Sequence, residues 1–164
     1  MNYKHYIDNG HAQFDKNDCL WQNTLEAGEG WRASDCNTKL PFLCKTPADP
    51  SATISTSEPR ECPDDWTEFS GACYLHQRTL VSWYGAAYEC EALGSVLTSV
   101  LSREEEQFIN KLAAGTGMGT FHLGGYIANT WKWLDGSPVT VIHSVTLTYD
   151  ASHFISVHVA DRLP

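Results

Sequence analysis

The sequence predicts an α+β fold stapled by disulfides, with two helices packed on small antiparallel sheets. Three observations favour this class. Two segments space their apolar residues as helices do, several short segments alternate around turns, and six cysteines lie among tryptophans and glycines. Hydrophobic residues make up 42% of the chain and aromatic residues 12%, so a packed core is expected.

The first predicted helix is the segment "SWYGAAYECEAL". One of its faces carries the less polar residues Trp83, Ala86, Ala87, Cys90 and Leu93. A glycine follows directly, at position 94, and glycine is the residue that most often ends a helix. We therefore expect the helix to end there and to bury this face.

The second predicted helix is "REEEQFINKLAA". It opens where Ser102 and Glu105 have the spacing of a capping box, and its apolar face consists of Phe108, Ile109 and Leu112. The acidic run 104–106 suits the positive end of the helix dipole, which explains it without a functional role.

The remaining elements are predicted to be short strands. "WTEFSGACYLHQ" alternates and turns at Ser70 and Gly71, which is typical of a hairpin. "FHLGGYI" and "WKWLDGSPV" are expected to be strands around glycine turns, and the last segment, 140–164, also alternates.

Charge and composition exclude several classes of partner. The net charge of −9 disfavours nucleic acid and anionic lipid, and no apolar run is long enough to insert in a membrane. Six cysteines favour an oxidising compartment, so we expect an extracellular or secreted protein. The polar segment after Met1 is not a signal peptide, so either secretion is not classical or the natural N-terminus lies elsewhere, and we expect the second.

Several segments resemble parts of the long form of the C-type lectin-like domain. "CPDDWTEFSGACY" is similar to its opening hairpin, the helix around Cys90 to its first helix, and "LTSVLSREEEQFI" to the next strand and second helix. "FHLGGYIANTWKWLDGSPV" resembles its core strand and the turn that follows. Near the N-terminus, "NYKHYIDNGHAQFDKNDCL" and "GWRASDCNTKLPFLCK" resemble its second half. The resemblance implies the fold class predicted above.

The resembling halves stand in reversed order. Residues 1–45 resemble the C-terminal half of one domain, and residues 62–139 the N-terminal part of a second; the Pro/Ser/Thr-rich segment 46–61 is a flexible linker, and 140–164 matches nothing in the family. Two interpretations follow, and they are compatible. The chain originates as a cut from a tandem-domain protein, and its halves either stay separate or fold together as one permuted domain, since an extended linker of this length can reach roughly 50 Å.

The family resemblance also implies three disulfides. It pairs Cys62 with Cys73 and Cys19 with Cys36, each within one half. The helix cysteine of the family bonds the last cysteine of the same domain, which here leaves Cys90 and Cys44. These two cysteines pair only if the halves combine, so their bond distinguishes one permuted domain from two separate half-domains.

Sugar-binding members of the family hold a calcium ion in the long loop. The resemblance places their Asn and Asp ligands at Arg32 and Ala33, and neither side chain offers an oxygen. The loop "IDNGHAQFDKNDC" also lacks the proline that directs family ligands. We therefore expect that the family-type calcium site is lost and that the chain has no metal or other cofactor.

The loop retains polar residues that are candidates for binding a ligand without calcium. These are Asn9, Gln13, Asp15 and Asp18, with Trp31 as a possible stacking face. The alternatives are a solvated loop with local turns and, for Trp31, a place in the core.

The expected function is that of an extracellular recognition module that resembles C-type lectins, with a glycan bound independently of calcium. One alternative is a protein–protein interaction module, with an extracellular protein as the partner; another is a truncated product without stable function. No nucleophile, base and oxyanion donor come together in the sequence, so an enzyme is not expected.

Overall fold

The computed structural model describes residues 19–24, 30–47, 62–117, 119–127, 130–139, 146–147 and 155–156. Its strands are β1 (Cys19–Asn23), β2 (Gly30–Ser34), β3 (Leu40–Pro47), β4 (Thr67–Phe69), β5 (Ala72–Val81), β6 (Val96–Leu97), β7 (Thr120–Ile127), β8 (Trp131–Trp133), β9 (Thr146–Leu147) and β10 (Ile155–Ser156). Its helices are α2 (Trp83–Ala92) and α3 (Arg103–Ala114). The two predicted helices and the α+β class are confirmed.

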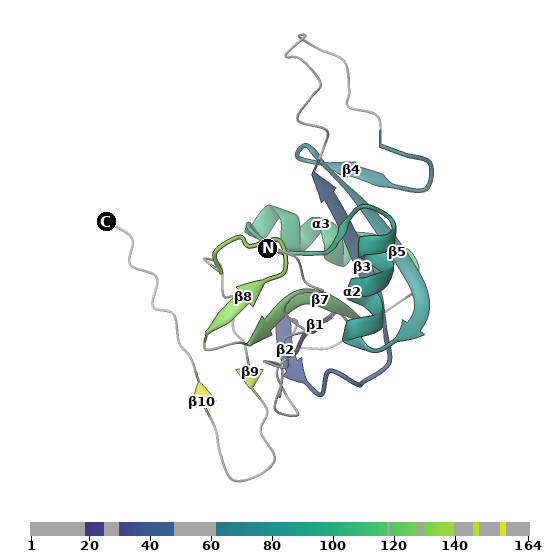
Figure 1. Cartoon of the computed structure of the whole chain (residues 1–164). Helices are drawn as coiled ribbons and strands as arrows, with labels where there is room; N and C mark the ends of the chain where they lie inside the picture. Colours follow the sequence, from purple (N-terminus) through teal and green to yellow (C-terminus); the bar gives the residue numbers. More distant parts are fainter. Residues whose placement is uncertain are drawn as a thin grey trace, which may run out of the picture.

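The strands before and after the linker are interleaved in one sheet. Its order is β2-β1-β7-β3-β5-β4, with β6 paired to β3 and β8 paired to β7. Strand β7 thus lies between β1 and β3, and β3 lies between β7 and β5, as the colours of Figure 1 show. Each part of the chain therefore satisfies backbone hydrogen bonds that the other part would leave open.

The sheet differs in one respect from the prediction of small antiparallel sheets. The main sheet is mixed, because β3 meets β7 in parallel at Phe42 and His122, whereas its other pairings are antiparallel. Only the short pair β9 and β10 forms a separate antiparallel sheet, and β9 lies beside β2 (Figure 1).

Helix α2 begins and ends as the sequence predicts, but its last apolar residue is not buried. Ser82 accepts a hydrogen bond from the backbone N–H of Gly85, and Gly94, with φ of 69°, closes the C-terminal turn. The residues at 83, 86, 87 and 90 are buried. The expectation for Leu93 is wrong: it is 51% exposed, because it is the C-cap and the chain turns away there.

Helix α3 opens with a modified capping box. The Ser102 hydroxyl accepts from the N–H of Glu105 at 3.1 Å, as predicted. The Glu105 carboxylate reaches one residue further back than usual and accepts from the N–H of Leu101 at 2.8 Å. Ile109 is fully buried, while Phe108 and Leu112 are partly buried against the same core.

Two glycine-containing segments show why glycine stands where it does. Ser70 and Gly71 both have positive φ and form the two-residue turn of the predicted β4–β5 hairpin. Gly124 and Gly125, in contrast, lie inside β7 and not in a turn, which corrects the expectation for "FHLGGYI". A Cβ on Gly124 would lie 2.2 Å from the carbonyl oxygen of Leu97, so the close approach of two backbones requires glycine.

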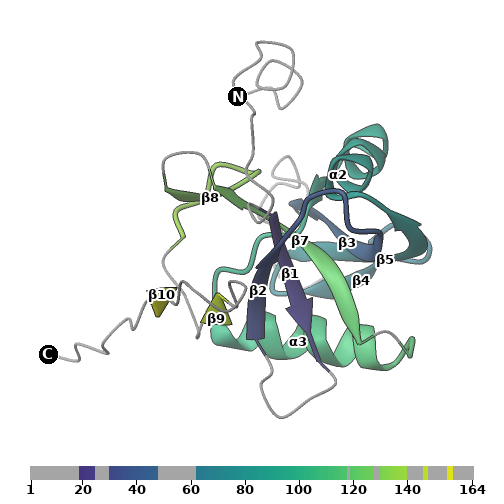
Figure 2. The same ribbon diagram turned by 90° about the horizontal axis from the view of Figure 1, so that it is seen from below.

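The helices cover opposite faces of the sheet. Figure 2 shows α2 and α3 with the strands between them. One core cluster packs Leu20, Trp31, Leu43 and Leu123 with Ile109 of α3. The other packs Phe42 and Cys44 with Trp83, Ala86 and Cys90 of α2. Both clusters combine residues from before and after the linker.

Three disulfides connect the chain: Cys19–Cys36, Cys62–Cys73 and Cys44–Cys90. These are the pairings that the family resemblance implies. The first two bonds each lie on one side of the linker, whereas Cys44–Cys90 joins β3 to α2 across it. Backbone hydrogen bonds cross in the same way, from Trp83 to Cys36 at 2.9 Å and from Thr98 to Leu43 at 2.9 Å.

Candidate ligand-binding surfaces

Four of the five predicted ligand-binding residues lie outside the described part of the chain. These are Asn9, Gln13, Asp15 and Asp18, which precede the first described residue, Cys19. The fifth, Trp31 of β2, is 1% exposed and packs edge-to-face on Trp133, with ring centroids 5.3 Å apart. Trp31 is therefore a core residue in the structure, and its ring offers no face to a ligand from solvent.

Arg32 and Ala33, the two positions where the resemblance places calcium ligands of the family, follow Trp31 on β2. The guanidinium carbon of Arg32 is 5.9 Å from the ring centroid of Trp21, the residue opposite it on β1. A cation at this distance is attracted by the indole ring, so Trp21 holds the positive charge in place. Ala33 adds only a methyl group. This part of β2 supplies no side-chain oxygen to a calcium ion.

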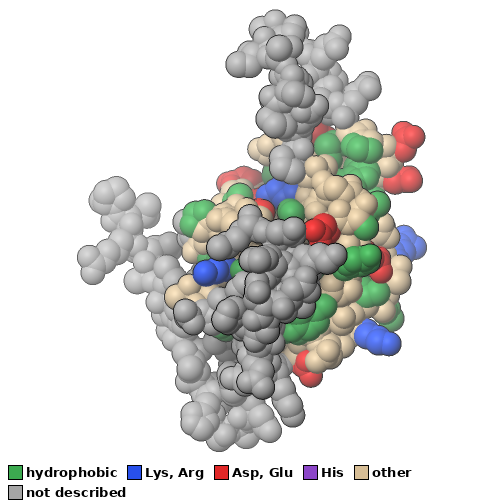
Figure 3. Space-filling model, viewed as in Figure 1, with side chains coloured by type: hydrophobic (Ala, Val, Ile, Leu, Met, Phe, Trp, Pro, Cys, Tyr) green, Lys and Arg blue, Asp and Glu red, His purple; other side chains and the backbone are tan. Residues whose placement is uncertain are grey.

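Among the described residues, no three His, Cys, Asp or Glu side chains come together as a metal site. The same residues contain no helix long and apolar enough to cross a bilayer. In the space-filling view, acidic, basic and hydrophobic side chains are interspersed over the described surface (Figure 3).

A second surface holds a buried polar network that connects β3, β5 and α3. One carboxylate oxygen of Glu105 accepts from the Nζ of Lys45 at 2.6 Å and from the Tyr74 hydroxyl at 2.6 Å. The side chains of Lys45 and Glu105 are only 14% and 7% exposed. Burial raises the pKa of Tyr74, and the hydrogen bond to Glu105 raises it further, so the phenol keeps its proton.

The network continues to the turn after β8. Lys45 donates a second hydrogen bond to the Ser99 hydroxyl at 3.3 Å, and Ser99 in turn donates to Asp135. Asp135 also accepts from the backbone N–H of Ser137 at 2.8 Å, which fixes its carboxylate. Two carboxylates therefore share the environment of one lysine.

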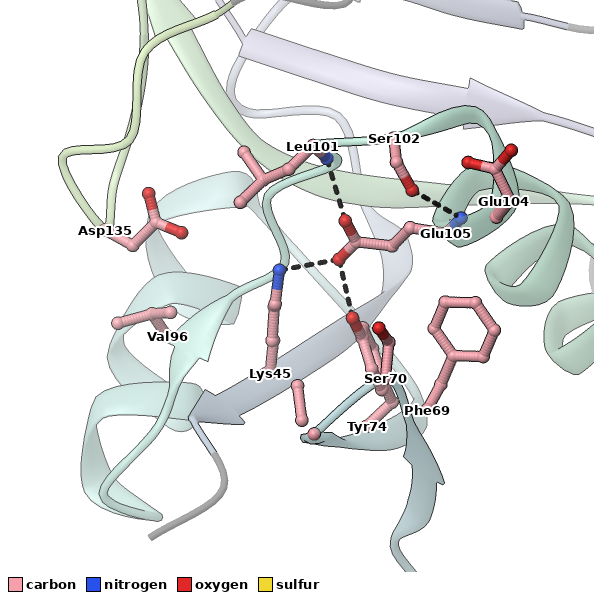
Figure 4. A pocket seen from close by; sticks show the side chains of 12 residues that line it. Lys45, Phe69, Ser70, Tyr74, Val96, Leu101, Ser102, Glu104, Glu105 and Asp135 are labelled. Atoms are coloured by element: carbon pink, nitrogen blue, oxygen red, sulfur yellow. Dashed lines mark hydrogen bonds and ion pairs between the residues drawn. The ribbon is translucent and has the colours of Figure 1, made fainter. Parts of the chain in front are cut away.

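Four residues of this network line a pocket with a volume of about 590 Å³ (Figure 4): Lys45, Tyr74, Glu105 and Asp135. Its lining comes from β3, the β4–β5 hairpin, β6, the first turn of α3 and the turn at Asp135. The sequence analysis did not find it. One signal was present, a lysine within the otherwise apolar strand "LPFLCK", but its partner Glu105 lies 60 residues away.

A family model for the C-type lectin domain matches residues 79–155. The chain belongs to the C-type lectin family. The match extends beyond Val139, where the resemblance of individual motifs ends. Two helices, a mixed sheet and three disulfides agree with this fold.

Curated members of the C-type lectin family are similar to parts of the chain. CD209 antigen-like protein A of Mus musculus is 36% identical over 50% of the chain and 35% of its own length. Secretory phospholipase A2 receptor and C-type mannose receptor 2, both of Mus musculus, are 30% identical over 71% and 72% of the chain, each over 8% of its own length. No solved structure matches significantly.

The chain thus spans about a third of the first relative and under a tenth of the two receptors. Because the receptor matches cover more than two thirds of the chain, they include most of the linker 46–61. Together the family and its relatives indicate a recognition module.

Proposed function

We propose that the chain is an extracellular recognition module that binds its ligand without calcium, through the polar residues of the loop that precedes β1 in the sequence. The observation that carries this proposal is the position of Arg32, whose guanidinium group lies over Trp21 beside Ala33. Calcium takes six to eight oxygen ligands in proteins, and a fixed guanidinium group repels it. The three disulfides support an oxidising, extracellular location.

The proposed ligand is a glycan. C-type mannose receptor 2, one of the similar proteins, is named for a sugar. Without an ion, a sugar must be held by hydrogen bonds and apolar contacts alone, and the polar loop residues proposed from the sequence would supply such hydrogen bonds. No metal and no enzymatic activity are part of this proposal.

An extracellular protein is the second candidate ligand. Secretory phospholipase A2 receptor is named for a protein, and the chain matches it over a similar share. Exposed apolar side chains favour this candidate: Tyr88 is 69% exposed, Leu80 is 60% exposed and Leu93 is 51% exposed. Aromatic residues of this kind are enriched at protein interfaces.

We also propose that the module is one permuted domain, derived from adjoining parts of two tandem domains. The bond between Cys44 and Cys90 and the interleaved strands support the first part of this proposal. The receptor matches that run through the linker support the second part. In a tandem protein, the same two cysteines would each find a partner beyond the present chain.

A glycan array probed with and without a calcium chelator tests the proposed ligand. We expect the same glycans to bind under both conditions, and loss of binding with the chelator would refute calcium independence. Binding to no glycan under either condition would favour the protein candidate. As a direct check, calorimetric titration with calcium should give no binding heat at micromolar concentrations.

The stability of the module needs a separate measurement, because a truncated product without stable function would also show no glycan binding. Thermal unfolding under oxidising conditions, followed by circular dichroism, should be cooperative for a folded domain. A gradual change without a transition would contradict the permuted domain.

A further inference from the structure

We propose that the pocket between the β4–β5 hairpin and α3 binds an organic cation, an ammonium or guanidinium group on an apolar stem. The pocket lining includes none of the residues proposed above for recognition, and none of β2. The inference therefore does not depend on the proposed function.

The charges of the pocket favour a positive ligand. Lys45 is neutralised by Glu105 at 2.6 Å, and both side chains are largely buried. The lining contains two further carboxylates, Glu104 and Asp135, and no other lysine or arginine. The described lining thus carries an excess of two negative charges. In Figure 4, Glu104 and Asp135 lie on opposite sides of the Lys45–Glu105 pair.

Glu104 is available to a ligand. Within the described part of the chain its carboxylate makes no hydrogen bond or ion pair, and the residue is exposed at the first turn of α3. Asp135, in contrast, is held by Ser99 and by the N–H of Ser137, so its carboxylate has a fixed direction. One carboxylate can adjust to the ligand while the other stays in place.

The uncharged walls suit the stem of such a ligand. Phe69, Val96 and Leu101 line the pocket together with Tyr74. Phe69 is itself fixed by stacking on Phe108, with ring centroids 4.4 Å apart. A cation gains further from aromatic rings nearby, and a cavity of about 590 Å³ has the size of ordinary small-molecule sites.

An anion fits this pocket less well, although a helix begins there. Helix N-termini attract anions through free N–H groups. Here the chain uses its own groups for this purpose, since Ser102 accepts from the N–H of Glu105 and the Glu105 carboxylate accepts from the N–H of Leu101. A bound anion would also face Glu104, a like charge at the same helix end.

Nuclear magnetic resonance of the intact, oxidised chain tests the proposal with two matched probes. The probes are n-butylguanidinium and its neutral analogue n-butylurea. We expect n-butylguanidinium to shift the backbone amide signals of Gly71, Leu101 and Ser102 with millimolar affinity. The urea should bind about fivefold more weakly, because it lacks the charge that faces two carboxylates. Equal affinity of both probes, or no shift at these amides, would overturn the proposal.

Charge variants locate the interaction. Glu104→Gln should weaken n-butylguanidinium binding about two- to fivefold. The matched control is Glu91→Gln, which removes an exposed glutamate of α2 outside the pocket. Equal weakening by both variants would show a general effect of net charge and would contradict a local site. Unchanged amide spectra of the free variants establish that both are folded.

A peptide pair distinguishes the source of the cation. Acetyl-Gly-Arg-Gly-amide carries the guanidinium as a protein side chain would, and the citrulline peptide is its neutral control. If the arginine peptide shifts the same amides and the citrulline peptide does not, the ligand is identified as a basic side chain of a partner protein. If n-butylguanidinium binds and the arginine peptide does not, the ligand is identified as a free small cation.

Discussion

The two faces of β3 connect the same parts of the chain by different chemistry. On the α2 face, Cys44 is fully buried in an apolar cluster and bonded to Cys90. On the other face, the next residue, Lys45, enters a polar network with Glu105 and Tyr74. Adjacent side chains of a strand point to opposite faces, so one strand makes both connections.

The difference between the faces lies in what each connection requires. A disulfide acts mainly on the unfolded chain, because it limits the conformations open to it. A buried ion pair acts on the folded chain, where each charge needs its partner to offset the loss of water. The α2 face should therefore respond to reduction, and the face with the polar network to the loss of a single polar group.

The largest effect is expected on the polar face. Glu105→Ala should lower the free energy of unfolding by about 3–5 kcal/mol, because it removes the ion-pair partner of the largely buried Lys45. It also removes the acceptor of the Tyr74 hydroxyl. Urea denaturation measures this, with Glu104→Ala as the exposed control, for which we expect about 0.5 kcal/mol or less. Similar losses for both variants would show that the network contributes nothing specific.

The next effect is expected on the α2 face. Replacing both Cys44 and Cys90 by alanine should lower the free energy of unfolding by about 2–4 kcal/mol. The control replaces Cys62 and Cys73, whose sequence separation is 11 instead of 46. A disulfide that closes a shorter loop restricts the unfolded chain less. Removing Cys62–Cys73 should therefore lower the free energy of unfolding by about 1 kcal/mol less than removing Cys44–Cys90. Peptide mapping that found free thiols at 44 and 90 would contradict the permuted arrangement directly.

A third comparison concerns the two glycines of β7, which also face opposite sides. Gly124→Ala should destabilise by about 1–3 kcal/mol or more, because its Cβ would meet a backbone oxygen, that of Leu97. Gly125→Ala would meet the side chain of Leu20, with the nearest atom at 2.3 Å. That side chain can move more easily than backbone, so the second variant should be the milder one in thermal unfolding. The reverse order would show that the strand backbone yields first.

The smallest effect is a dependence of stability on pH. His122 is buried, and its Nε2–H donates to the carbonyl oxygens of Thr38 and Val81, each at 3.1 Å. Its Nδ1 is buried without a partner among the described residues. Burial lowers the pKa of His122 below the ordinary value of 6.5, and the two carbonyls offset part of that shift. The folded chain therefore binds a proton less readily than the unfolded chain.

The sign follows from that difference in proton binding. Stability is complete above pH 6.5 and decreases as the pH falls below it, toward the lower pKa of the folded state. His76 has a pKa lowered by burial and by Arg78, and it acts in the same direction. The measurement is the slope of the unfolding free energy between about pH 7 and 5.5, for the original chain and for His122→Gln. The slope should be smaller for the variant. The difference isolates His122, because His76 contributes to both slopes. An unchanged slope would contradict this role.

Local features were predictable from the sequence where neighbouring residues determine them. The cap at Ser102, the hairpin turn at Ser70 and Gly71 and the end of α2 at Gly94 all depend on a few adjacent residues. The pairing of Cys44 with Cys90 was implied only by resemblance to a family.

Features that depend on distant residues were not predictable. The partners of Lys45 and the need for glycine at 124 arise from segments far apart in the sequence. The candidate site followed this pattern too. The sequence left two places for Trp31, the core or the ligand-binding surface. Its contact with Trp133 in the structure shows that it lies in the core.

Because the strands are interleaved, the order of synthesis determines when each strand can pair. Strand β3 leaves the ribosome before either of the strands that flank it, and about 80 further residues must follow before β7 is complete. At about 5–20 residues per second, β3 waits roughly 4–16 s for β7, and the Cys44 thiol waits roughly 2–9 s for Cys90, which lies 46 residues further along. Until the partners appear, an apolar strand and an unpaired cysteine are exposed together in the nascent chain.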